Sequence, residues 1–142
     1  MNNHLYHDMN VFVSSQRIDE PHTAALIDKL REAGFRVSHS PKNPSDGHDE
    51  RWTNWYHKGL INDLDETIVF IAAIDMGWDS ATWMAIESDE ARRRLTGGQI
   101  RQMYYYNPLH IAVKAKGMLP YLKEQLPDDL DSVIETLSKL SQ

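Results

Sequence analysis

Cysteine is absent from this chain, so the sequence excludes disulfides, a thiol nucleophile and cysteine-type zinc sites. Long hydrophobic runs are absent as well, since the longest, Ile68–Ile74, is far too short for a membrane-spanning helix. Positive charge is scarce, because 15 Lys and Arg stand against 21 Asp and Glu and leave a net charge of −6. This balance disfavours a nucleic-acid partner and a membrane-surface partner. The absence of cysteine fits a cytoplasmic protein, which is the expected location.

Two groups of motifs are also missing. No Gly-x-Gly-x-x-Gly follows an apolar strand and no Gly-Lys-Ser/Thr loop occurs, so the loops that commonly hold nucleotide cofactors are lacking. The 7 histidines form no paired motif of the kind that binds zinc. We expect no metal and no bound cofactor. NAD as a redox cofactor is disfavoured, whereas NAD as a consumed substrate remains open.

Short apolar runs alternate along the chain with helical patterns, which is typical of a parallel sheet covered by helices. Strands are predicted at 10–15, 35–40, 67–74 and 100–106, and helices at 19–33, 49–64, 80–95 and 128–140. The region 108–127 is ambiguous and is compatible with a short edge strand and a short helix. We expect an α/β, flavodoxin-like three-layer sandwich whose parallel central sheet has four or five strands and helices on both faces.

The 142 residues suit a single domain with one core. Residues 1–9 are polar and are expected to form a flexible N-terminal extension. Residues 10–142 are expected to form the domain itself, in which 119–142 make a C-terminal helical segment.

A lone glutamate follows two tryptophans in the stretch 75–87, which reads DMGWDSATWMAIE. If the helix begins near Ser80, a good N-cap residue, Trp83 lies one turn before Glu87 on the same side of the helix. Met84, on the predicted core stripe, lies roughly 60° from Glu87 around the helix axis. Glu87 therefore borders the buried face of the predicted helix.

No cation lies one turn before or after Glu87, whereas Glu90 has Arg94 four residues later and forms an ordinary surface pair with it. An unpaired acid beside apolar side chains is costly unless something compensates its charge, and such acids are candidates for function. The alternative is a boundary residue whose carboxylate reaches water or a distant arginine. Helix geometry alone leaves both interpretations open.

Residues 10–95 resemble a TIR (Toll/interleukin-1 receptor-like) domain of the bacterial type. The similar segments are VFVSSQRID (11–19), AALIDKLREAGFRV (24–37), DGHDERW (46–52), LDETIVFIAA (64–73) and DSATWMAIE (79–87). The last segment resembles the family pattern Ser-x-x-Trp-x-x-x-Glu, which carries the family's glutamate onto Glu87. Two departures are the serine at Ser15, where the family commonly has an aromatic residue, and a C-terminal third without a clear counterpart. The related nucleoside 2-deoxyribosyltransferases have a similar turn, but with a glycine where this chain has Ala81.

The resemblance implies that the chain is a TIR-like domain that cleaves the nicotinamide–ribose bond of NAD⁺. The product would be linear, cyclic or transferred ADP-ribose, in bacterial defence or signalling. Because nicotinamide departs as a neutral molecule, the reaction needs no general acid, only a carboxylate, Glu87, that stabilises an oxocarbenium-like ribose. The implied substrate-binding residues are Ser14, Ser15, Arg17, Asp75, Asp79, Ser80 and Trp83. Lys42 and Arg51 are further candidates for a phosphate contact.

Each of these residues also has a purely structural alternative, as a strand-end serine, a helix cap, a solvated cation or a core tryptophan. Two rival functions stay open. A nucleoside 2-deoxyribosyltransferase or deoxynucleotide N-hydrolase would need a second acid, Asp75 or Asp79, to protonate a neutral base. A non-catalytic TIR-like interaction or nucleotide-sensing module would use the same fold for assembly. A homo-oligomer or a separate effector protein is the expected protein partner.

Overall fold

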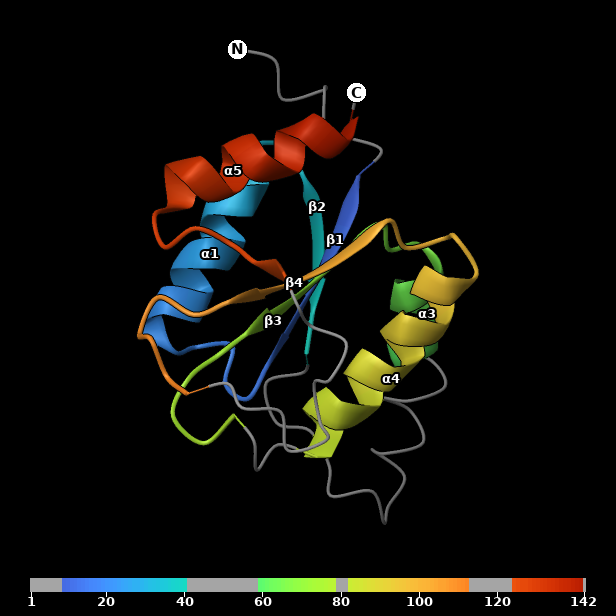
Figure 1. Cartoon of the computed structure of the whole chain (residues 1–142), viewed down its shortest axis with the longest axis horizontal. Coiled ribbons are helices and arrows are strands. Elements are labelled where there is room, and N and C mark those ends of the chain that lie inside the picture. Colours follow the sequence, from blue (N-terminus) through green and yellow to red (C-terminus); the bar gives the residue numbers. More distant parts are fainter. Residues whose placement is uncertain (1–8, 41–58, 79–81, 113–123, 142) are drawn as a thin grey trace.

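The computed structural model describes residues 9–40, 59–78, 82–112 and 124–141 (Figure 1). The strands in these ranges are β1 (Asn10–Ser15), β2 (Arg36–His39), β3 (Val69–Ala73), β4 (Gln102–Tyr106) and β5 (Glu124–Gln125). The helices are α1 (Pro21–Glu32), α3 (Ile61–Asp65), α4 (Thr82–Thr96) and α5 (Leu130–Ser138), and the 3-10 turn η4 (Lys139–Ser141) follows α5. No helix in the described ranges is long and apolar enough to cross a membrane.

The five strands form one parallel sheet in the order β2-β1-β3-β4-β5. The predicted α/β, flavodoxin-like fold with a parallel sheet is therefore confirmed. In this order β2 is added on one side of β1, whereas β4 is added on the opposite side of β3. The point at which the strand order reverses, called the topological switch point, therefore lies between β1 and β3. Ligands of open α/β sheets bind outside the carboxyl ends of the strands at such a point. Ser15 of β1 and Ala73 of β3 lie side by side there.

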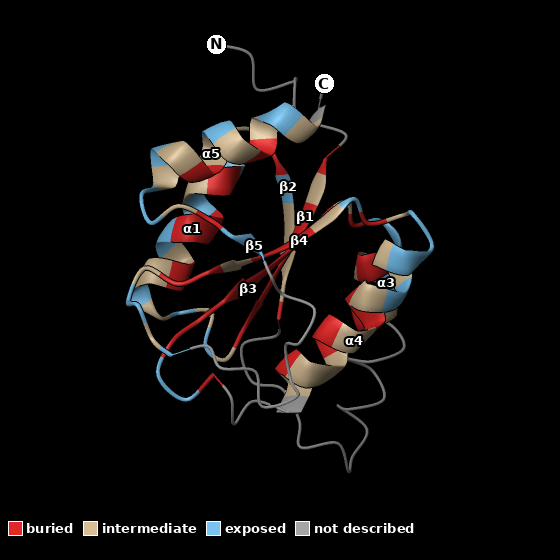
Figure 2. Cartoon of the chain, viewed as in Figure 1, coloured by how far each residue is buried: buried red, intermediate tan, exposed pale blue. Residues whose placement is uncertain are grey.

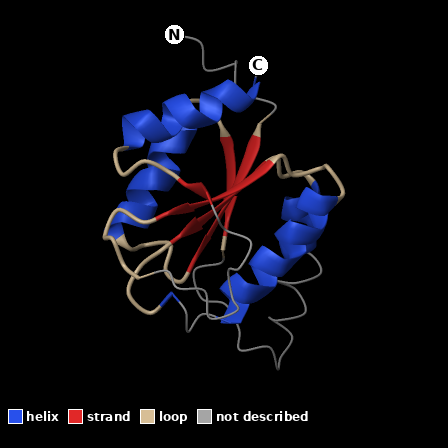
Figure 3. Cartoon of the chain, in the orientation of Figure 1, coloured by secondary structure: helices blue, strands red, loops and turns tan. Residues whose placement is uncertain are grey.

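Helices cover both faces of the sheet. Helices α1 and α5 lie on one face, and α3 and α4 lie on the other (Figures 1 and 3). Successive side chains of β1 alternate between the faces, as the pleat requires. Val11 and Val13 join the apolar cluster under α1 and α5, whereas Phe12 joins the cluster under α3 and α4. The alternation continues to the end of the strand, so that Ser14 faces α4 and Ser15 faces α1.

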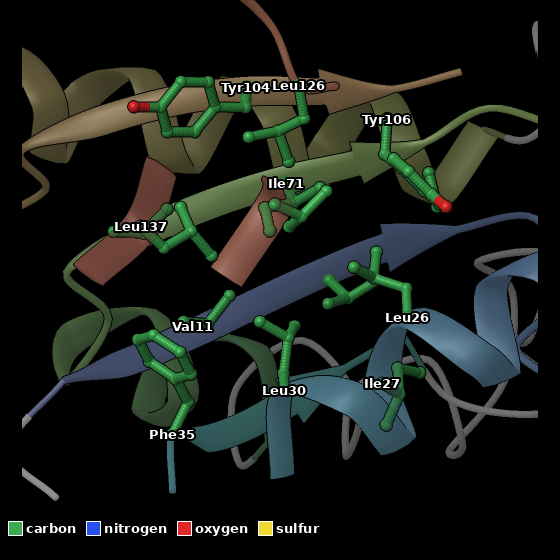
Figure 4. Packing of buried hydrophobic residues seen from close by; sticks show 14 of the residues in the cluster. Val11, Leu26, Ile27, Leu30, Phe35, Ile71, Tyr104, Tyr106, Leu126 and Leu137 are labelled. Carbon is green, nitrogen blue, oxygen red and sulfur yellow. The ribbon is translucent and has the colours of Figure 1, made fainter. Parts of the chain in front are cut away.

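Each face has its own apolar core, and the three central strands β1, β3 and β4 between them are largely buried (Figure 2). Under α1 and α5, Leu26 and Leu30 of α1 meet Val11 and Ile71 of the sheet, with Leu137 of α5 nearby (Figure 4). The other core lies under α3 and α4 and contains Phe12, Leu60, Leu64, Phe70, Met84, Ala91 and Met103. Both faces of the central strands are therefore apolar, which explains the continuous hydrophobic run at 67–74.

Most predicted boundaries agree with the structure to within a few residues. Strand β1 occupies the predicted range, and α1 begins at Pro21, where the carboxylate of Glu20 accepts hydrogen bonds from the first backbone N–H groups. Within the ambiguous region 108–127, the structure shows only the short edge strand β5, and residues 113–123 lie outside the described ranges. The first part of the predicted helix 49–64 also lies outside them.

Residue 9 ends the predicted N-terminal extension, but its side chain belongs to the core. Met9 is 4% exposed and packs with the cluster under α1 and α5. Its backbone oxygen also accepts a hydrogen bond from the N–H of Arg36, next to the first pairs of β1 with β2. The remainder of the predicted extension, 1–8, lies outside the described residues.

Candidate functional site

Glu87 lies on α4 with its side chain turned inward against the end of β1, and it is 0% exposed. Two hydroxyl groups donate to the same carboxyl oxygen. Ser14 Oγ and Ser40 Oγ each lie 2.6 Å from Glu87 Oε1. The second oxygen, Oε2, is equally buried and has no hydrogen-bond partner among the described residues. Such a half-satisfied buried group costs about 1–3 kcal/mol of stability and calls for an explanation.

The backbone of β1 orients Ser40. The N–H of Ser15 donates to Ser40 Oγ at 3.0 Å, which directs the hydroxyl proton of Ser40 toward Glu87. The N–H of Ser40 in turn donates to the carbonyl of Val13 at 3.1 Å, so parallel pairing continues just beyond β2. Ser14 and Ser40 are both 0% exposed. The carboxyl of Glu87 is therefore held by the carboxyl ends of two neighbouring strands.

Trp83 ties the beginning of α4 to the same strand end. Its indole Nε1–H donates to the carbonyl of Ser15 at 2.9 Å, and its ring packs on the apolar cluster under α3 and α4. Trp83 and Glu87 are thus both directed at the end of β1, as the predicted one-turn spacing on α4 implied.

Replacing Trp83 with Phe should lower the free energy of unfolding by about 1–2 kcal/mol, because the carbonyl of Ser15 loses its indole donor while most of the ring packing remains. Urea denaturation followed by circular dichroism measures this difference. An unchanged free energy of unfolding would show that the hydrogen bond from the Trp83 indole to the Ser15 carbonyl does not stabilise the fold.

Burial raises the pKa of Glu87 from 4.5 to about 8. The two serine hydroxyls act in the opposite direction, since they stabilise the ionised carboxylate, and the charge of Asp63 on α3 adds to the increase. Because no cation among the described residues compensates the charge, desolvation outweighs the hydroxyls. In the free protein at neutral pH the carboxyl is mostly neutral. Both hydroxyls donate to Oε1, so the acidic proton belongs on Oε2.

Asp63 is a second acid on this side of the sheet. Burial raises the pKa of Asp63 above its ordinary value, the charge of Glu66 adds to this effect, and the charge of His39 at the end of β2 opposes it. Two carboxyl groups with raised pKa values therefore lie on the α3/α4 face. Sequence reasoning did not single out Asp63, because only the packing of α3 against α4 brings it near Glu87.

Asp75 lies on the other side of the sheet edge and belongs to a different group of side chains. It is 3% exposed, and with the Gln16 amide turned so that its nitrogen faces Asp75, that nitrogen donates to Asp75 Oδ1 at 3.0 Å. Burial raises the pKa of Asp75, with a further contribution from Glu20, against the charge of His22. His22 contacts the Glu20 carboxylate through Nδ1 and lies 2.9 Å from the carbonyl of Ile74 through Nε2.

The predicted site residues thus separate into distinct groups. The structure brings Ser14, Trp83 and Glu87 together on the α4 side. The Ser15 hydroxyl faces α1 instead and has no hydrogen-bond partner among the described residues, although its backbone holds both Ser40 and Trp83. Arg17 is exposed in the loop after β1 and lies 3.4 Å from Asp19. Four further predicted residues lie outside the described ranges: Asp79, Ser80, Lys42 and Arg51.

Ser40 is the member of the site that sequence reasoning missed. The available signal was weak: a serine ends the predicted second strand, as serines end the first, and parallel strands bring their carboxyl ends to one edge. In the part of the chain that the structure describes, no group of three His, Cys, Asp or Glu residues could hold a metal ion.

Comparison with known proteins shows what this fold is similar to. No family model matches the sequence, and no curated protein matches it either. Among solved structures, the TIR domains of the activated Roq1 resistosome, which directly recognises the pathogen effector XopQ, match with a TM-score of 0.53 and 16% sequence identity. The match covers 94% of this chain and 83% of that chain. The fold is TIR-like. The predicted likeness is thus confirmed for the fold, and it extends beyond residues 10–95 into the C-terminal third.

Proposed function

We propose that this TIR-like protein cleaves the N-glycosidic bond of NAD⁺ and that Glu87 is its catalytic residue. One observation carries the proposal: a fully buried carboxyl stands at the carboxyl ends of β1 and β2, beside the switch point of the parallel sheet. One of its oxygens is held by two hydroxyls, and the other is unpartnered among the described residues. A purely structural acid would have both oxygens satisfied or would be paired with a cation. An oxygen left free at the ligand-binding edge is suited to meet a ligand.

The proposed chemistry needs one negative oxygen. The bond between ribose C1′ and the pyridinium nitrogen breaks, its electron pair goes to the nitrogen, and nicotinamide leaves as a neutral molecule. The positive charge moves to the ribose as an oxocarbenium ion, which the carboxylate of Glu87 stabilises. Water then adds to C1′ and loses one proton, which gives ADP-ribose. Attack by a group of the substrate itself or by another acceptor would instead give a cyclic or transferred product.

The positive charge of bound NAD⁺ favours the ionised form of Glu87, which burial disfavours in the free protein. Glu87 is neutral at pH 7 in the free protein because burial raises its pKa to about 8. A pyridinium ring brought beside it supplies the missing cation and favours the carboxylate. Because the side chain is 0% exposed, a sugar reaches Oε2 only after the groups that cover it move. The proposed reaction therefore includes an opening step before chemistry.

Four other predicted residues have supporting roles in this proposal. Trp83 walls the site beside the reacting ribose, since its ring lies one helical turn from Glu87 and is anchored to Ser15. Arg17, exposed at the same sheet edge, reaches a phosphate of the dinucleotide. Asp79 and Ser80, which precede α4, are proposed as contacts to the ribose hydroxyls.

One observation favours a second candidate, a deoxynucleoside or deoxynucleotide N-glycosidase. Glu87 retains a proton at neutral pH because burial raises its pKa to about 8, and a protonated carboxyl can give that proton to a neutral base as it leaves. In this reaction Glu87 itself supplies the acid for which the sequence suggested Asp75 or Asp79. The structure groups Asp75 with Glu20 and His22 instead.

The pH dependence of base release separates the two candidates. For NAD⁺, kcat/KM should rise with pH until about pH 8, because the free protein must lose the proton of Glu87. For a deoxynucleoside, kcat/KM should fall above that pH, because the same proton is required. Chromatography of released nicotinamide or purine between pH 5.5 and roughly 9.5 measures both. Absence of base release from either substrate at every pH would reject both enzymatic proposals and favour an interaction or sensing module.

Assembly of several copies is part of the proposal. The TIR domains of the similar structure belong to an activated resistosome, and we propose that copies of this chain also associate when active. Specific activity that rises with protein concentration, together with a matching rise in mass by light scattering, is the expected result. Specific activity that stays constant while the protein remains monomeric would contradict it.

A further inference from the structure

The hydrogen bonds around Glu87 are asymmetric, and the asymmetry has a chemical meaning. Both hydroxyls, from Ser14 and Ser40, donate to Oε1 at 2.6 Å, and no described residue donates to Oε2. A carboxyl held at one oxygen from two directions cannot turn about its last torsion without losing both bonds. Its two oxygens are therefore not interchangeable in this site.

We infer that Ser14 and Ser40 are positioning residues that lock Oε1 of Glu87 and so assign to Oε2 the contact with the sugar carbon of a cationic N-glycoside. This inference rests on the proposed function and adds a separate role for each oxygen of Glu87: Oε1 accepts from the serines, and Oε2 meets the sugar. The fold supports it, since Ser14 lies at the end of β1, Ser40 directly follows the neighbouring strand β2, and Glu87 comes from α4, which packs on β1. The N–H of Ser15 completes the arrangement by fixing the direction of the Ser40 hydroxyl.

The serines have a second effect that a merely space-filling role would not produce. Each hydroxyl stabilises the ionised form of Glu87 and lowers its pKa against the effect of burial. Among the described residues, Asp63 of α3 is the titratable group that acts on Glu87, and it raises the pKa of Glu87. His39 of β2 acts in turn on Asp63. Removal of either serine hydroxyl should therefore raise the pKa of Glu87, while Asp63→Asn should lower it.

The test uses the whole chain with single substitutions Ser14→Ala and Ser40→Ala. Ser88→Ala is the matched control, because Ser88 follows Glu87 on α4 and has an equally buried hydroxyl with no hydrogen-bond partner in the described ranges. The first readout is the infrared carbonyl band of the protonated Glu87 carboxyl, identified by its loss in Glu87→Gln and titrated against pH. Each serine variant should shift the midpoint upward by about one pH unit, and the control should leave it unchanged.

The second readout is nicotinamide release from NAD⁺, in which the serine variants should lose about tenfold or more in kcat near neutral pH with little change in KM. Unchanged infrared midpoints in both folded serine variants would overturn the inference. Equal kcat values in the serine variants and in Ser88→Ala would overturn it as well. If one alanine variant fails to fold, the infrared midpoint and the kcat of the other variant test the inference. A wild-type protein that releases no base would instead reject the proposed function, and the infrared titration would still show whether the serines control Glu87.

Discussion

Glu87→Gln should reduce nicotinamide release from NAD⁺ by at least about 10²-fold in kcat, the scale of loss when a preorganised charge-stabilising group is removed. The amide has nearly the same size and shape, and its oxygen can accept the hydrogen bonds of Ser14 and Ser40 as Oε1 does. The substitution therefore leaves the packing intact and removes only the negative charge that meets the ribose cation. Chromatographic quantification of nicotinamide over time, with saturating NAD⁺, gives the ratio of kcat values.

Glu90→Gln is the matched control for this experiment. Glu90 is also a buried acid of α4, but its carboxylate lies 3.1 Å from Arg94, which pairs with Asp65 of α3 as well. The same change in charge, three residues further along the helix, should leave kcat close to that of the wild type below the unfolding temperature. Equal loss of activity in both variants would point to general damage to α4, and full activity in Glu87→Gln would remove Glu87 from the mechanism.

The second large effect concerns stability. The free energy of unfolding of the wild-type protein should fall as pH rises from 4.5 to about 8, because burial raises the pKa of Glu87 over that interval. The unfolded chain ionises this group at the lower pH, whereas the folded chain keeps its proton up to the higher one. The folded state thus binds more protons in this window, and raising the pH favours unfolding. The loss is on the order of a few kcal/mol for a fully buried group.

In Glu87→Gln this component of the pH dependence should disappear. The variant should match the wild type near pH 4.5 and exceed its stability near pH 8, since the amide resembles the protonated acid. A smaller decline with the same sign should remain, because burial also raises the pKa values of Asp63 and Asp75. Urea titrations at a series of pH values measure these curves. Parallel curves for the two proteins would show that Glu87 is not a buried neutral acid.

Much of the fold could be predicted from the sequence because local patterns decide it. The apolar run that becomes β3 is buried on both faces, and the amphipathic stripe of α5 buries Val133 and Leu137. Asp129 caps that helix by accepting from the N–H of Ser132, so the helix itself begins two residues later than predicted. Edge strand β5 has only two residues, and so short a segment carries no periodic pattern that could identify it.

The candidate site was predictable only in part, because its contacts join distant segments. The helical pattern placed Glu87 at the border of the buried face, and the structure buries it completely. Its hydroxyl partners lie 73 and 47 residues away in the sequence, at Ser14 and Ser40. Only the strand order, with β2 beside β1, brings both serines beneath α4. The sequence predicts that side chains of β1 alternate between the two faces of the sheet, but it does not predict which face α4 covers. The sequence therefore could not show which of Ser14 and Ser15 faces Glu87.

The most direct measurement is a crystal structure with a carbocyclic, uncleavable analogue of NAD⁺. The carbon that replaces ribose C1′ should lie about 3–3.5 Å from Glu87 Oε2, the separation of reacting atoms in a productive complex, while Oε1 keeps both serine hydroxyls. An analogue bound elsewhere, with Glu87 still covered and its carboxyl out of reach of the sugar, would contradict the proposed role of Glu87.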